Sequence, residues 1–263
     1  MTGPASPEVV VHRTPDLLAA TTAARLLVHL VDAQAARGTA SFVATGGGMG
    51  SAVLAAVAAA PARDAVDWGR VDVWWGDERF LPDGDPERNE TQAREALLDA
   101  VPLDPARVHR MAPSDGPLGD DADAAARAYA AELTAAAGPG DPLGVPELDV
   151  VLLGVGPDAH VASLFPGHPG ARVTDRGVIA VRESPKPPPV RISLTFPALN
   201  RGREVWLVAS GEGKAGAVAL ALSSAGQIAV PAAGVRGTSR TVWLLDRAAA
   251  AQAPQALARP GSP

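Results

Sequence analysis

Short runs of hydrophobic residues recur along the chain and predict β-strands separated by longer helical segments. Residues 148–153, LDVVLL, carry one charged side chain, which is typical of a strand covered on both faces of a parallel sheet. Similar runs predict further strands at residues 8–12, 41–44, 71–75, 177–181, 191–195, 204–210 and 241–245.

Segments rich in alanine and leucine lie between these runs and predict helices. Thr14 and Pro15 form a suitable cap and first turn for a helix that should end near Gly38, and Pro61 should stop the next one. Further helices are predicted at residues 51–60, 87–100 and 120–137, and one opens near residue 214. Strands that alternate with helices predict an α/β fold, with a mostly parallel sheet and helices on both faces.

Length and composition indicate one globular domain. The chain has 263 residues, of which 47% are hydrophobic, and this is ample for one large core. No change in composition demands a second domain, so residues 1–250 are expected to form a single domain. Residues 251–263 contain mainly alanine, proline and glycine toward their end and are expected to form a flexible tail.

Charge and cysteine content exclude several classes of protein. The chain has 23 basic and 29 acidic residues, and its net charge of -6 argues against a nucleic-acid-binding surface, although a local anion site stays open. The absence of cysteine excludes thiolate metal sites, cysteine nucleophiles and a secreted disulfide-framed protein. No signal peptide or apolar run of about 18 residues is present, so we expect a cytoplasmic protein without a membrane partner.

An acid and a histidine follow the strand at residues 148–153. Gly154 and Gly156 allow a sharp turn that delivers Asp158 and His160 to the carboxyl end of the strand, where ligands bind in open α/β sheets. An imidazole titrates near neutrality, and an acid two residues away can orient it. His160 is therefore the best candidate for a general base, with a purely structural histidine as the alternative.

A glycine-rich turn follows the strand at residues 41–44. In the turn, Gly46, Gly47 and Gly48 precede a helix, so their backbone N–H groups can converge on an anion such as a phosphate. A turn that needs glycine only for packing is the alternative. The Lys and Ser/Thr residues of a P-loop do not follow Gly50.

Charged residues at three other places could also reach a ligand. Asp77 and Arg79 follow the strand at residues 71–75, on the same side of the sheet as His160, although a solvated ion-pair cluster would explain them equally. Arg191 begins a strand, and Lys214 follows another strand and opens a helix, so both could bind a phosphate. Each could instead be an ordinary surface charge.

Other kinds of chemistry lack a matching pattern. Residues 154–159 fit a loose dinucleotide fingerprint, but Pro157 and Asp158 occupy the place where a helix should meet the pyrophosphate. His160 and His168 do not have a metal-binding spacing, and Ser163 is not in the G-x-S-x-G motif of serine hydrolases.

Four segments in order closely resemble 6-phosphogluconolactonases: WWGDERF at 74–80, LLGVGPDAHVASLFPG at 152–167, RISLTFPALN at 191–200 and GEGKAGAV at 211–218. The match covers nearly the whole chain. It implies a Rossmann-like α/β fold, kinship with glucosamine-6-phosphate deaminases, and a cytosolic, cofactor-independent enzyme. The implied reaction is hydrolysis of 6-phosphoglucono-δ-lactone to 6-phosphogluconate in the oxidative pentose phosphate pathway.

For hydrolysis of such a lactone we expect the following roles. His160 would activate water, Asp158 would orient the imidazole, and Arg79 would stabilise the oxyanion or bind sugar hydroxyls. Asp77 would bind sugar hydroxyls. The phosphate would be held by a group that consists of Gly46, Gly47, Gly48, Arg191 and Lys214. A glucosamine-6-phosphate deaminase and a non-catalytic sugar-phosphate sensor are the competing interpretations.

The sequence departs from the family pattern at two places. Ala159 replaces the usual glycine between the acid and the histidine, and Gly48-Met49-Gly50 replaces a Ser-Thr-Pro-like continuation of the phosphate turn. If residue 159 takes a positive φ, alanine there should shift His160.

Overall fold

A seven-stranded sheet in which all neighbouring strands are parallel forms the centre of the protein. The structure is a computed structural model, and it describes residues 6–138, 141–223, 225–254 and 258–260. The strand order is β10-β1-β9-β8-β5-β2-β3. The strands are β1 (Glu8–His12), β2 (Ala40–Ala44), β3 (Val71–Trp75), β5 (Leu148–Gly154), β8 (Gly202–Ala209), β9 (Arg240–Asp246) and β10 (Ala258–Pro260).

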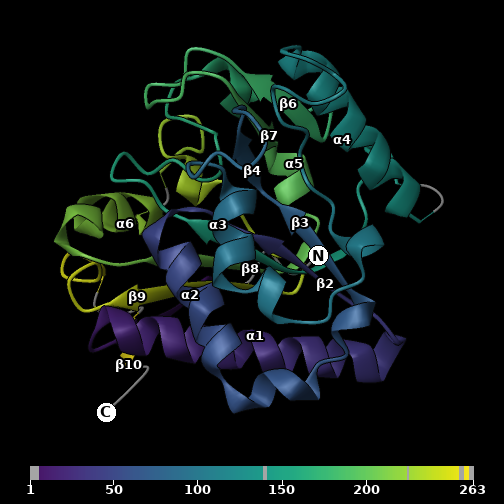
Figure 1. Ribbon diagram of the computed structural model, residues 1–263. Helices are drawn as coiled ribbons and strands as arrows, with labels where there is room; N and C mark the ends of the chain where they lie inside the picture. The colour runs from purple at the N-terminus through teal and green to yellow at the C-terminus, as the bar shows by residue number, and fades with distance from the viewer. Residues whose placement is uncertain (1–5, 139–140, 224, 255–257, 261–263) are drawn as a thin grey trace.

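Helices cover both faces of the sheet, which confirms the α/β prediction (Figure 1). Helices α1 and α2 contact each other and strand β5 on one face, and α4 lies on the other side of the sheet. The helices are α1 (Pro15–Arg37), α2 (Gly47–Ala59), α3 (Asn89–Ala96), α4 (Ala122–Ala136), α5 (Phe196–Leu199) and α6 (Ala215–Leu222). Short 3-10 turns occur at Pro61–Ala65, Trp68–Arg70, Leu98–Ala100, Pro105–Arg107, Pro169–Arg172, Glu212–Lys214 and Pro231–Ala233.

The sequence dictates the ends of α1 and its buried face. The Thr14 hydroxyl accepts a hydrogen bond from Leu17 N at 3.2 Å, and Gly38 closes the helix with a φ of 81° that favours glycine. Leu26 and Leu30 are four residues apart on one face and are fully buried, so α1 is fixed to the sheet by this apolar face.

The middle of the core lies around β2. Phe42 is opposite Val73 of β3 on one side and Val150 of β5 on the other, and all three side chains are fully buried. From β2 the chain crosses to β3, whereas from β5 it continues to β8 on the opposite side. The crevice between the carboxyl ends of β2 and β5 is therefore the topological switch point, where α/β sheets bind ligands.

A second, antiparallel sheet of three strands is the main feature that the sequence did not predict. Its order is β4 (Asp77–Arg79), β7 (Arg191–Leu194) and β6 (Val178–Val181), and α4 packs against β6 and β7. Short buried runs look alike in parallel and antiparallel sheets, so sequence alone assigned no second sheet.

The largest differences from the predicted boundaries occur at three places. Helix α2 begins at Gly47 rather than after Gly50, because the glycines themselves form its first turn. Helix α3 ends at Ala96, and a separate 3-10 turn follows it. Residues 258–260, within the segment expected to be flexible, form β10 beside β1, whereas residues 255–257 and 261–263 lie outside the described part. No helix in the described ranges is long and apolar enough to cross a membrane.

Candidate active site

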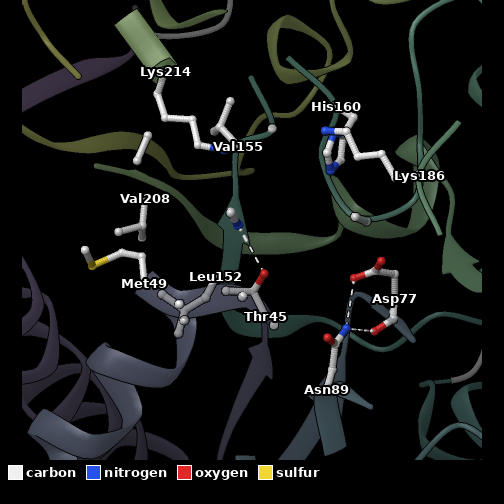
Figure 2. Close-up of a pocket in the computed structure, with 18 of the residues that line it drawn as sticks. Thr45, Met49, Asp77, Asn89, Leu152, Val155, His160, Lys186, Val208 and Lys214 are labelled. Atoms are coloured by element: carbon white, nitrogen blue, oxygen red, sulfur yellow. Dashed lines mark hydrogen bonds between the residues drawn. The ribbon is translucent and has the colours of Figure 1, made fainter. Parts of the chain in front are cut away.

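A cavity of about 520 Å³ opens at the carboxyl ends of β2, β5 and β8 (Figure 2). Its size lies within the range typical of small-molecule sites. Eight of the nine predicted site residues line it: Gly46, Gly47, Gly48, Asp77, Arg79, His160, Arg191 and Lys214. The ninth, Asp158, is hydrogen-bonded to one of these eight, so the fold brings all nine together.

Asp158 and His160 form a close pair at the end of β5. Nδ1 of His160 lies 2.6 Å from Oδ1 of Asp158. An ionised carboxylate can only accept hydrogen bonds, so Nδ1 carries the donated proton and the neutral ring has its lone pair on Nε2. Within the described part of the chain, Nε2 has no hydrogen-bond partner. The imidazole is thus arranged to accept a proton from a bound molecule.

A tight turn of the backbone holds this pair. Gly156 N donates to the carbonyl of His160 at 2.9 Å, and Ala159 N donates to the carbonyl of Gly156 at 2.9 Å. The imidazole lies so close to Gly156 that a Cβ there would be 2.0 Å from Nδ1 of His160. Glycine is therefore required at residue 156 for the ring to occupy this position.

Ala159 adopts the left-handed conformation, with a φ of 66°. A non-glycine residue in this region costs roughly 1 kcal/mol. A positive φ at residue 159 is the condition under which alanine was expected to shift His160. The 2.6 Å contact between His160 and Asp158 is nevertheless present. The turn accommodates Ala159, whose side chain is buried in the core.

The electrostatic surroundings favour a neutral imidazole beside an ionised carboxylate. Burial raises the pKa of Asp158, but hydrogen bonds from His160 and Lys186 outweigh burial and lower the pKa to about 2. Burial lowers the pKa of His160, and the nearby Lys186 cation lowers it further, whereas Asp158 partly opposes this. At neutral pH the pair therefore consists of a carboxylate and an imidazole that is free to act as a base.

Lys186 is a site residue that the sequence interpretation missed. Its Nζ lies 2.9 Å from Oδ1 of Asp158 and 3.2 Å from Nδ1 of His160. Prolines surround it in the segment SPKPPP at 184–189, which is typical of a stiff surface loop, and no local pattern singles out the lysine. The signal was present in the composition, because Lys186 and Lys214 are the only lysines in the chain and both line the cavity.

The glycine turn presents the start of α2 to the cavity. Gly46 is the N-cap, no side chain caps the helix, and its first turn has no acidic residue. The first N–H groups of the helix are therefore available to an anion. Packing explains Gly46, because a Cβ there would lie 1.8 Å from Oδ1 of Asn89, whereas a Cβ at Gly48 would meet no atom within 4 Å.

Strand β4 supplies the opposite side of the cavity, where Asn89 connects two predicted residues. Nδ2 of Asn89 donates to the carbonyl of Asp77 at 2.7 Å, and Oδ1 of Asn89 accepts from Arg79 at 2.8 Å (Figure 2 shows the Asp77 contact). Ser163 donates to Oδ2 of Asp77 at 2.6 Å. Asn89 is brought here by tertiary packing, and no local pattern in the sequence indicates it.

Glu78 connects β4 to the start of α3 through hydrogen bonds. Its fully buried carboxylate accepts hydrogen bonds from the backbone N–H groups of Arg79 at 2.8 Å, Asn89 at 2.6 Å and Glu90 at 2.9 Å. Burial raises the pKa of this carboxyl group to about 7, against the opposing effect of Arg88. The position of Arg79 beside the cavity therefore depends on a polar network within the core.

Arg191 and Lys214 differ in how much of each side chain is free. Arg191 is buried, and its Nε and Nη2 donate to the carbonyls of Lys186, Pro187 and Pro188 at 2.9 to 3.2 Å. Lys214 has no hydrogen-bond or ion-pair partner among the residues that the structure describes. Burial, with a contribution from Lys186, lowers its pKa.

The two ends of the cavity carry different groups. Figure 2 shows Lys214 on the opposite side of the pocket from His160 and Lys186, with Thr45 between them lower in the view. The Thr45 hydroxyl accepts a hydrogen bond from Gly154 N at 3.1 Å, which ties the turn after β2 to the turn after β5. An elongated ligand can therefore contact the imidazole at one end and a free cation at the other.

Several known proteins are similar to this chain in sequence and in fold. The family described as glucosamine-6-phosphate isomerases/6-phosphogluconolactonase matches residues 13–243. A 6-phosphogluconolactonase of Streptomyces coelicolor is 64% identical and covers 98% of both chains, and one of Mycobacterium tuberculosis is 52% identical over 91% of this chain and 95% of its own. The solved structure of the 6-phosphogluconolactonase from Trypanosoma brucei is 30% identical, with a TM-score of 0.78, and the match covers 94% of this chain and 98% of that one.

Proposed function

Because the chain belongs to the family of glucosamine-6-phosphate isomerases and 6-phosphogluconolactonases, we propose that it hydrolyses 6-phosphoglucono-δ-lactone to 6-phosphogluconate. One observation carries the proposal: His160 is hydrogen-bonded to Asp158, its Nε2 has no partner among the described residues, and it lines a cavity with Lys214 and the N-terminus of α2. In a cell this reaction would serve the oxidative pentose phosphate pathway.

Hydrolysis of a lactone requires one activated water and a stabilised oxyanion. Nε2 of His160 accepts a proton from water as the water oxygen attacks the lactone carbonyl carbon. The tetrahedral intermediate then collapses, the bond to the ring oxygen breaks, and His160 returns the proton to that oxygen. Asp158 holds the imidazole in the required tautomer throughout, as a carboxylate does for the histidine of a serine protease.

Arg79 is assigned to the developing oxyanion or to the sugar hydroxyls. One of its guanidinium nitrogens, Nη1, is bound to Asn89 and to the carbonyl of Glu87. Nε and Nη2 have no hydrogen-bond partner in the described ranges, so they are available to a substrate oxygen. Asp77, beside Arg79 on β4, is assigned to the sugar hydroxyls.

The phosphate is assigned to the end of the cavity away from His160. The uncapped start of α2 at Gly46, Gly47 and Gly48 offers N–H donors, and Lys214 offers a positive charge that no described residue pairs with. Arg191 lies instead at the His160 end, because it donates to the carbonyls of the loop that carries Lys186 and its Nη1 is 3.9 Å from Oδ2 of Asp77. Binding energy from the phosphate would position the distant carbonyl.

A coupled assay tests this function. The lactone is generated freshly with glucose-6-phosphate dehydrogenase, and 6-phosphogluconate is followed with its dehydrogenase. The proposal predicts hydrolysis well above the spontaneous rate, and a rate equal to the spontaneous one would contradict it. Ammonia released from glucosamine 6-phosphate would favour a deaminase instead. Tight binding of 6-phosphogluconate in a calorimeter without hydrolysis would favour a sugar-phosphate sensor.

A further inference from the structure

We propose that Lys186 is a positioning residue whose ammonium group holds Asp158 and His160 in the arrangement that leaves Nε2 of the imidazole free to take a proton from water. This inference rests on the proposed lactone hydrolysis and adds a residue to it. Lys186, Asp158 and His160 then act as one unit, to which a loop far from β5 in sequence contributes the cation.

The hydrogen bonds around Asp158 support this role. Its Oδ1 accepts from both Nδ1 of His160 at 2.6 Å and Nζ of Lys186 at 2.9 Å. A carboxylate held by two donors keeps its charge and has little freedom to rotate. The Asp158 side chain is about one third exposed with Lys186 in place, so the second donor restricts a side chain that solvent reaches.

The short distance between Lys186 and the imidazole has a second consequence. Nζ lies 3.2 Å from Nδ1 of His160, and each of the two nitrogens is a donor toward Asp158. A positive charge this close opposes a positive charge on the ring, so the imidazole stays neutral. The charges of Asp158 and Asp77 also act on His160, and both favour the protonated ring. Lys186 is the cation that counters them.

The loop that carries Lys186 is held by hydrogen bonds from Ser184 within the loop and from Arg191 on β7. Ser184 donates through Oγ to the carbonyl of Lys186 at 2.8 Å. Nη2 of Arg191 donates to the carbonyls of Lys186 and Pro187 at 3.2 and 2.9 Å. Nε of Arg191 donates to the carbonyl of Pro188 at 3.2 Å, and these three contacts fix the backbone from which the lysine extends. Arg191 thus acts on the site through Lys186.

Three variants test the proposal: Lys186→Met, Lys186→Arg and, as a matched control, Lys214→Met. Lys186→Met should lower kcat, but by less than the roughly 10²- to 10⁴-fold expected for loss of a general base. It should also move the acid limb of the kcat profile to higher pH, because the pKa of His160 rises when the cation is removed. Lys186→Arg should retain most of the wild-type kcat and should leave the acid limb close to its wild-type pH. Lys214→Met should raise KM and leave the acid limb in place.

A titration without substrate separates this inference from the proposed function. NMR of protein labelled at its five histidines follows the His160 ring directly, with His160→Gln used to assign its signal. The Lys186→Met variant should show a higher pKa for His160 than the wild type does. An unchanged His160 titration and an unchanged acid limb would overturn the proposal, as would a Lys186→Met effect on KM alone. If the wild type fails to hydrolyse the lactone, the titration still decides the role of Lys186.

Discussion

Gly156 determines where the imidazole of His160 can lie, because any side chain at residue 156 would occupy the space of the ring. Gly156→Ala should force the ring away from Asp158 and reduce kcat toward the level of an enzyme without its base, roughly 10²-fold or more. The atoms that a new Cβ would meet belong to side chains, so the fold should persist. Steady-state kinetics with a thermal melt would check both parts.

Gly138→Ala is the matched control for this substitution. A Cβ at residue 138 would meet no atom within 4 Å, and the residue lies outside the cavity. This control should leave kcat unchanged. Wild-type turnover in Gly156→Ala would show that the imidazole does not need its present position.

Ala159 is the residue at which backbone strain and catalysis are separable. Replacement by glycine should relieve the left-handed strain of about 1 kcal/mol, but it also removes a buried methyl group and increases the entropy of the unfolded chain. These effects nearly cancel, so we expect the stability to change by less than about 1 kcal/mol. Because His160 already contacts Asp158, kcat should stay within about threefold of the wild type. A larger rise in kcat would mean that alanine displaces the ring.

At the scale of elements, His109 joins β3 to α4. Its Nε2 lies 3.0 Å from Asp72 on β3, its Nδ1 lies 2.8 Å from Glu132 on α4, and its ring stacks on Trp74 at 3.7 Å. Burial lowers the pKa of His109, but the two carboxylates outweigh burial and raise it to about 9. The ring is therefore charged at neutral pH and binds the two elements together.

This arrangement makes stability depend on pH. The pKa of His109 is higher in the folded protein than the ordinary value of 6.5, so its contribution is complete below that value and is lost as the pH rises through about 9. Over this range the free energy of unfolding in urea should fall by about 1 to 2 kcal/mol, allowing for solvent screening at Glu132. His109→Gln should lack this decrease. An equal decrease in the variant would assign the pH dependence to other groups.

Elements that carry their own local signals are those that the sequence predicts well. The cap at Thr14 and the glycine at residue 38 define α1, and the apolar run at 148–153 defines most of β5. The antiparallel sheet lacks such a signal, because β4 contains only Asp77, Glu78 and Arg79 and is identified by its pairing with β7. Pairing between distant segments depends on tertiary structure, which local propensity does not encode.

At the scale of the whole molecule, the order of the strands assembles the site. Predicting strands that alternate with helices was enough to place His160, Asp77 and the glycine turn at one edge of the sheet. The roles of Lys186, Asn89 and Arg191 depend instead on the loop between β6 and β7, the start of α3 and strand β7 itself. These contacts join residues that are far apart in the sequence. The sequence therefore predicted the candidate catalytic and binding residues of the site, but not the contacts that position them.

The most direct test of the central claim compares lactone hydrolysis by the wild type and by His160→Ala in the coupled assay. A parallel His29→Ala variant serves as the control, because His29 lies on α1 and outside the cavity. We predict that His160→Ala lowers kcat by roughly 10²- to 10⁴-fold and that His29→Ala does not change it. Wild-type turnover in His160→Ala would contradict the role of His160 as the base that activates water.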